Sequence, residues 1–173
     1  ADAAGKAIRP FFRAQCGLDD KARGGAPFDP VTEADRAAEV VRRAMIGQTF
    51  PSHGILGEEF GAERTDAECV WVLDPIDGTR AFIAGLPTWG TLIALNDGQQ
   101  PVLGILNQPF PREPSVGTRQ AARCNGVPLK TRPCASPGDA TLMATTPDLF
   151  SAPLPLPASH RPARQVPPAR SGR

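Results

Sequence analysis

The sequence predicts an α+β or layered α/β fold in which helices pack on a sheet, and three observations support this class. Residues 1–50 contain two segments with helical periodicity. Residues 53–110 contain four apolar runs of strand length, and the run 69–75 is apolar almost throughout, as in a strand covered on both faces. Helices followed by a group of strands are typical of a sheet with helices packed against it.

The first predicted helix covers residues 4–16. Pro10 is expected to kink or shorten it. One face would carry the apolar residues that recur every three or four positions, namely Ile8, Phe11, Phe12 and Cys16. Residues 17–28 are polar and rich in glycine, so we expect a loop there.

The second predicted helix runs from about residue 33 to residue 47. Thr32 can cap its start, and Gly47 and Pro51 are expected to end it. Its buried stripe is predicted from hydropathy to consist of Ala37, Val40, Val41, Ala44 and Met45.

Strands are predicted at residues 53–61, 69–75, 88–98 and 101–110. The last two would form a hairpin, because Asp97 and Gly98 are strong turn residues. Weaker strand signals occur near Val116 and Leu129, and residues 140–146 are another expected strand.

The composition excludes several classes of protein. The 173 residues, 40% hydrophobic and 21% charged, suit a globular domain, and no apolar run reaches the ~18 residues of a membrane helix. The net charge of +1 gives no reason to expect a nucleic-acid partner. The four cysteines form no CxxC pair, which favours reduced thiols and a cytoplasmic location, and the chain start lacks a secretory signal.

The domain organisation is predicted to change near residue 150. Residues 151–173 contain six prolines, four arginines and no acid, so we expect a disordered Pro/Arg-rich tail after a domain over residues 1–150. Such a tail either has no function or is a proline-rich ligand for a partner domain.

Five acidic residues lie at the ends of predicted elements: Asp35, Glu58, Glu59, Asp74 and Asp77. Taken one at a time, each has an ordinary structural explanation. Asp35 could be an acid in the first turn of a helix, Glu58 and Glu59 a solvated strand end, and Asp74 and Asp77 part of a turn. Together they predict a metal site, because strand ends of a layered sheet gather at one crevice. Carboxylates that meet there repel one another unless a cation binds, and oxygen ligands suit Mg²⁺, Mn²⁺ or Ca²⁺. The backbone N–H groups of Gly78 and Thr79 would add an anion site.

Three segments resemble the N-terminal signatures of the inositol monophosphatase-like family: DPVTEADRAAE (29–39), GEE (57–59) and WVLDPIDGTRAFIAGLPTWGTLIAL (71–95). The segment that begins at DGT (77–79) is closer to the histidinol-phosphatase branch than to the inositol monophosphatases. The resemblance covers roughly residues 1–150 and implies the N-terminal part of the αβαβα sugar-phosphatase fold. It also implies a Mg²⁺-dependent phosphomonoesterase that uses two or three ions, with Mn²⁺ as a substitute.

The resemblance also implies a role for each matching residue. Glu58, Asp74, the Ile76 carbonyl and Asp77 would bind metal, with Asp74 bridging two ions. Glu59 would either support these ligands or bind a water held by the metal. Asp35 and Thr79 would orient and deprotonate the attacking water, alongside Glu58 as a catalytic residue. The substrate phosphate would lie on Gly78, Thr79 and Asp77, and Arg80 is equally well a substrate contact or a surface arginine.

The sequence departs from the family after residue 150. Family members continue with further strands, helices and a metal-binding aspartate, so we expect the C-terminal part of the fold to be missing here, with a frameshift as one explanation of the tail. The leading interpretation is histidinol phosphate hydrolysis for histidine biosynthesis. The alternatives are an inositol-1-monophosphatase, a bisphosphate nucleotidase and an inactive metal-binding fragment. A small phosphomonoester is the expected partner, no membrane is expected, and a homodimer is left open.

Overall fold

The computed structural model of the chain describes residues 1–14, 18–20 and 30–141. The chain separates into two compact units, residues 1–129 and 130–173. In the second unit, the described residues contain a single 3-10 turn, Pro137–Asp139, beside which Arg132 Nη2 donates to the Asp139 carbonyl at 2.9 Å. The domain boundary predicted at residue 150 lies outside the described residues and stays a prediction.

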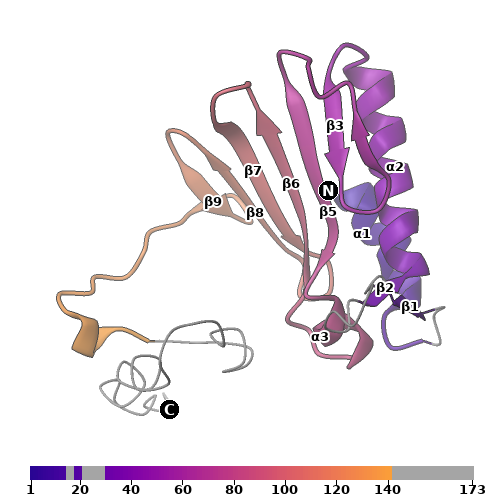
Figure 1. Ribbon diagram of the computed structural model, residues 1–173. Helices are drawn as coiled ribbons and strands as arrows, with labels where there is room; N and C mark the ends of the chain where they lie inside the picture. Colours follow the sequence, from indigo (N-terminus) through magenta and orange to yellow (C-terminus); the bar gives the residue numbers. More distant parts are fainter. Residues whose placement is uncertain (15–17, 21–29, 142–173) are drawn as a thin grey trace, which may run out of the picture. The chain divides into compact units, whose positions relative to one another are not determined.

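The first unit contains one long helix, shorter helical elements and a series of strands (Figure 1). The helical elements are α1 (Asp2–Ile8), the 3-10 turn η1 (Arg9–Phe11), α2 (Glu33–Thr49) and α3 (Thr79–Ile83). The strands are β1 (Leu18–Asp20), β2 (Pro30–Thr32), β3 (Gly54–Gly57), β4 (Gly61–Glu63), β5 (Val70–Asp77), β6 (Gly90–Asn96), β7 (Pro101–Gln108), β8 (Glu113–Thr118), β9 (Ala122–Cys124) and β10 (Val127–Pro128).

Eight strands of the described residues form one mixed sheet in the order β10-β9-β8-β7-β6-β5-β3-β4. Only β3 and β5 pair in parallel; the other neighbours are antiparallel. The predicted α+β or layered α/β class is therefore confirmed. The loop expected over residues 17–28 is wrong at residues 18–20, because β1 pairs there with β2. The rest of that predicted loop, residues 17 and 21–28, lies outside the described residues.

Helices α1 and α2 contact each other and lie along one face of the sheet (Figure 1). Helix α1 ends at Ile8, and Pro10 follows within a 3-10 turn, so the predicted first helix is shorter than its periodicity suggested. A proline nitrogen cannot donate the next helical hydrogen bond, which accounts for the early end. Cys16 lies outside the described residues.

Helix α2 begins with a capping box. The backbone N–H and the hydroxyl of Thr32 both donate to Asp35 Oδ2, at 2.8 and 2.6 Å, and the Thr32 cap is thus confirmed. The predicted apolar stripe is wrong, since Val40 and Met45 are 54% and 51% exposed. The buried face of α2 instead consists of Ala34, Asp35, Ala38, Glu39, Arg42 and Ile46.

Two apolar clusters form the core on the helix side of the sheet. One gathers α1 and α2 with the end of β5 and with α3 around Phe82 and Trp89. The other joins Ile46 of α2 to Trp71 and Leu73 of β5 and to their strand neighbours. Val72, between those two β5 residues, points to the opposite face and is 39% exposed. The prediction that this strand is covered on both faces is therefore wrong within the described residues.

The hairpin between β6 and β7 is confirmed. Asp97 Oδ1 accepts the backbone N–H groups of Gln99 and Gln100, at 3.1 and 2.9 Å, and Gly98 takes a positive φ of 84°. Among the described residues, Cys69 and Cys124 are free thiols, as is the exposed Cys134. None of the helices in these residues has the length and apolarity to cross a membrane.

Candidate metal and phosphate site

The ends of the two parallel strands bring Glu58 and Asp74 together. Gly57 of β3 lies opposite Leu73 of β5, and the Glu58 N–H donates to the Leu73 carbonyl at 3.1 Å. The residues that follow Gly57 and Leu73 are both acids, so their two carboxyl groups become neighbours and share a hydrogen bond. The sequence-based prediction that these two strand ends meet is borne out by this register.

The β5 backbone is irregular directly after Asp74. The pairing of β5 with β6 shifts between Asp74 and Asp77, and this break contains Pro75 and Ile76. Gly78 follows with a positive φ of 87°, and α3 then begins at Thr79. The break and the turn place Asp77 close enough for its negative charge to act on Asp74.

The electrostatics of this strand end favour a bound cation. Burial raises the pKa of Asp74 to about 7, and the charges of Glu58 and Asp77 and the hydrogen bond with Glu58 act in the same direction, whereas the charge of Arg42 opposes them. Asp74 Oδ1 is buried and has no hydrogen-bond partner. An acceptor without a donor, among further carboxylates, fits a divalent ion with oxygen ligands.

The two predicted water-orienting residues have defined local partners. Thr79 Oγ1 donates to the Ile76 carbonyl at 3.0 Å, the same carbonyl that is expected to bind metal. Asp35 is 3% exposed, and its Oδ2 accepts both donors of Thr32. Strand β2, which leads into α2, contacts α3, so the helix starts that carry Asp35 and Thr79 belong to one region.

The predicted site residues around Asp74 differ in their exposure. Glu58 and Asp77 are exposed, Glu59 is half-buried and its backbone N–H donates to Glu39, and Arg80 is exposed on α3. In the part of the chain that the structure describes, no three His, Cys, Asp or Glu side chains gather in a ready-made metal cage. The assignment of metal, water and phosphate ligands therefore stays a prediction.

Two buried charges on α2 were not identified from the sequence. Glu39 is fully buried and accepts the N–H groups of Glu59 at 2.8 Å and Phe60 at 3.2 Å. Arg42 is 3% exposed and donates to the carbonyls of Asp74 at 2.8 Å and Pro75 at 3.4 Å. Burial lowers the pKa of Arg42 to about 10. Because both side chains are charged, a prediction of the buried helix face from apolar residues does not include them.

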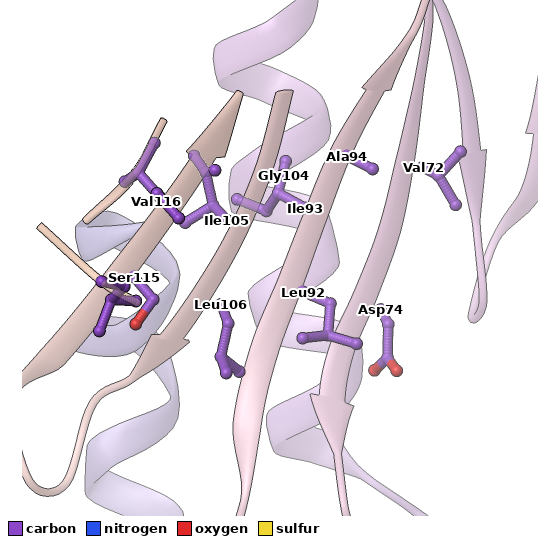
Figure 2. Close-up of a pocket in the computed structure, with 13 residues that line it drawn as sticks. Val72, Asp74, Leu92, Ile93, Ala94, Gly104, Ile105, Leu106, Ser115 and Val116 are labelled. Carbon is purple, nitrogen blue, oxygen red and sulfur yellow. The ribbon is translucent and has the colours of Figure 1, made fainter. Parts of the chain in front are cut away.

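A groove of about 470 Å³ runs across the face of the sheet opposite these helices. Figure 2 shows Val72, Leu92 and Leu106 along it, with the carboxyl group of Asp74 beside Leu92. Apart from Asp74 and Ser115, the lining residues are apolar or glycine. The candidate site thus lies where an apolar surface meets the polar strand ends.

Comparison with known proteins identifies relatives over most of the chain. The model of the inositol monophosphatase family matches residues 1–151. A bifunctional chloroplastic phosphatase, IMPL2 of Arabidopsis thaliana, is 44% identical over 87% of this chain and 43% of its own length. The histidinol-phosphatase of Mycobacterium tuberculosis is 41% identical over 63% of this chain and 41% of its own length.

Solved structures share the fold. That of an inositol monophosphatase from Zymomonas mobilis is 49% identical, with a TM-score of 0.67, over 81% of this chain and 53% of that one. The chain thus spans about half the length of the relatives that it matches.

Proposed function

The chain belongs to the inositol monophosphatase family, and from this premise we propose that it hydrolyses a small phosphomonoester with Mg²⁺, with histidinol phosphate as the favoured substrate. Members of the family are phosphatases, and metal dependence with Mg²⁺ is typical of them. The observation that carries the proposal is the meeting of the Glu58 and Asp74 carboxyl groups at adjacent strand ends, next to the Gly78 turn.

The donor set suits Mg²⁺. The groups at the strand ends are oxygen donors, and Asp74 Oδ1 lacks a protein donor. We assign Glu58, Asp74, Asp77 and the Ile76 carbonyl as the protein ligands. When bound, Mg²⁺ would offset the charge of the phosphate and favour deprotonation of water.

The residues of the chain supply positioning and proton transfer in this proposal. The Gly78 and Thr79 N–H groups would donate hydrogen bonds to the phosphate oxygens. Gly78 has a positive φ at this turn, which a glycine adopts without strain. Thr79 and Asp35 would orient a water, and its proton would pass to the Asp35 carboxylate as its oxygen attacks phosphorus. The ester P–O bond then breaks, the leaving oxygen takes a proton from solvent water, Asp35 returns its proton to the solvent, and inorganic phosphate remains.

A phosphate-release assay on the full chain tests the proposal. The substrates are histidinol phosphate, inositol 1-phosphate and adenosine 3′,5′-bisphosphate, each with and without Mg²⁺. Mg²⁺-dependent release that a Glu58→Gln variant loses supports the assignment. Release that is unaffected by EDTA, or by this variant, would contradict it.

Inositol phosphate is the second candidate substrate. The 49% identity to the Zymomonas mobilis inositol monophosphatase favours it, whereas the relative from M. tuberculosis favours histidinol phosphate. The ratio of kcat/KM on the two substrates decides between them. Mg²⁺ binding by calorimetry without release from any of the three substrates would instead favour the non-catalytic alternative, and the stoichiometry of that titration gives the number of ions.

A further inference from the structure

We infer that Glu39 and Arg42 are positioning residues: from the helix side of the sheet they hold the backbone ends of β3 and β5 so that the Glu58 and Asp74 carboxyl groups meet on the other side. The inference rests on the proposed function in one respect, since it takes this carboxyl pair as the divalent-ion site. It assigns to α2 a role beyond packing.

The two residues are neighbours on α2 and act on neighbouring strand ends. They are three positions apart in the helix, which places them on the same face. Glu39 accepts the two N–H groups that follow Glu58, and Arg42 donates to the carbonyls of Asp74 and Pro75. Each side chain thus holds the backbone at or next to one member of the carboxyl pair.

The geometry shows that the contact is made through the backbone. A β-carbon added at Gly57 would lie 1.8 Å from Glu39 Oε1, so Gly57 faces α2. Glu58, the first residue after β3, shares a hydrogen bond with Asp74, so its carboxyl group lies with that of Asp74. Asp74 lies on the opposite face of the sheet, where it lines the groove (Figure 2). The two positioning residues therefore act on the placement of the carboxylates without occupying the site.

The chemistry of the two side chains matches what the strand ends lack. The N–H groups just beyond β3 need an acceptor, and the carbonyls at the β5 irregularity need donors, since regular pairing stops there. Arg42 also reaches the Leu92 carbonyl of β6 at 3.4 Å, so it spans the break between β5 and β6. Arg43 Nε donates to Glu39 Oε1 at 2.8 Å, which fixes the rotamer of that acid.

The test uses the full chain and four variants. Glu39→Gln replaces part of the acceptor by a donor, Arg42→Met removes all donors at similar length, and Arg42→Lys restores one donor. The control is Ile46→Val, which loosens the packing of α2 against the sheet but removes no hydrogen bond to either strand end. All measurements are made below the melting transition of the least stable variant.

The first measurement is Mg²⁺ affinity by calorimetry without substrate. Loss of the hydrogen bonds that orient a metal ligand typically weakens metal binding about 10- to 100-fold. We expect a loss of Mg²⁺ affinity in this range for Glu39→Gln and Arg42→Met. Arg42→Lys should recover part of the affinity. Ile46→Val should stay near the wild-type value. Equal affinities for Arg42→Met and Ile46→Val would overturn the inference.

The second measurement needs no metal. Hydrogen exchange of the Glu59 and Phe60 amides should speed up about tenfold or more in Glu39→Gln, as expected when a hydrogen bond to a charged acceptor is lost, and should not change in Ile46→Val. Unchanged exchange in Glu39→Gln would overturn the inference. A wild-type chain that binds no divalent ion would refute the proposed metal site, and the positioning role would then be decided by these exchange rates alone.

Discussion

Replacement of Asp74 by asparagine should stabilise the metal-free protein at neutral pH. In the folded chain, burial and the neighbouring charges of Glu58 and Asp77 raise the pKa of Asp74 from 3.8 to about 7. Between these pH values the folded state keeps a proton that the unfolded chain has lost. The free energy of unfolding of the wild type therefore falls as the pH rises from about 4 to 7. Asparagine does not titrate, so the variant should lack this slope.

The magnitude follows from the displacement of the pKa. One pKa unit corresponds to ~1.4 kcal/mol, but Asp74 is only half-buried, so solvent screening reduces the effect to about 1–2 kcal/mol above pH 7. For a chain of this size that is a rise in melting temperature of about 3–6 °C. At pH 4 the two proteins should melt within about 1 °C of each other, because little of the difference in bound protons has accumulated.

The assay is thermal unfolding followed by circular dichroism in EDTA, from pH 4 to pH 8. Asp97→Asn is the matched control, because hydrogen bonds from the backbone N–H groups of Gln100 and Gln99 lower the pKa of Asp97. Its carboxylate stabilises the fold above its unfolded pKa, so this variant should lose stability at neutral pH and match the wild type in acid. An Asp74→Asn protein that melts at or below the wild-type temperature at pH 8 would refute the reasoning.

Two further predictions concern the same strand ends. Asp74→Asn should weaken Mg²⁺ binding more than Glu59→Gln in a calorimetric titration, because Asp74 has the unpaired Oδ1; the reverse order would remove its bridging role. Gly57→Ala should cost about 1–3 kcal/mol in chemical denaturation, since the added carbon would lie 1.8 Å from Glu39 Oε1. Gly47→Ala, which meets nothing within 4 Å in α2, should instead gain about 0.5–1 kcal/mol, and similar effects of the two substitutions would contradict the close approach.

The meeting of the two acid-bearing strand ends could be predicted from the sequence because its signals are local. An apolar run followed by GEE and another followed by DPID mark two strand ends, and parallel pairing makes such ends neighbours. The Thr32 cap and the Asp97 turn are likewise set by residues within three or four positions. The open face of β5 could not be predicted in this way, since an apolar run is the same whether one or both faces are covered.

The buried face of α2 shows where hydropathy misleads. Val40 and Met45 are apolar and exposed, whereas Glu39 and Arg42 are charged and buried. A charged side chain can be buried when strand ends distant in sequence provide its hydrogen-bond partners. Those partners are set by the sheet register, which periodicity within the helix does not contain.

The candidate site combines two chemically different surfaces, an apolar groove on the open face of β5 and a polar region beyond the end of that strand. On the open face, Val72 and Leu92 give the groove an apolar surface that offers no donor to an anion (Figure 2). A phosphate needs N–H donors or cations, and in the proposed site these would lie beyond the strand end, at Gly78, at Thr79 and at an ion held by the carboxylates. The groove and the phosphate position are therefore chemically separate. Asp74 belongs to both regions, because it lines the end of the apolar groove and is also one of the carboxylates of the proposed metal site.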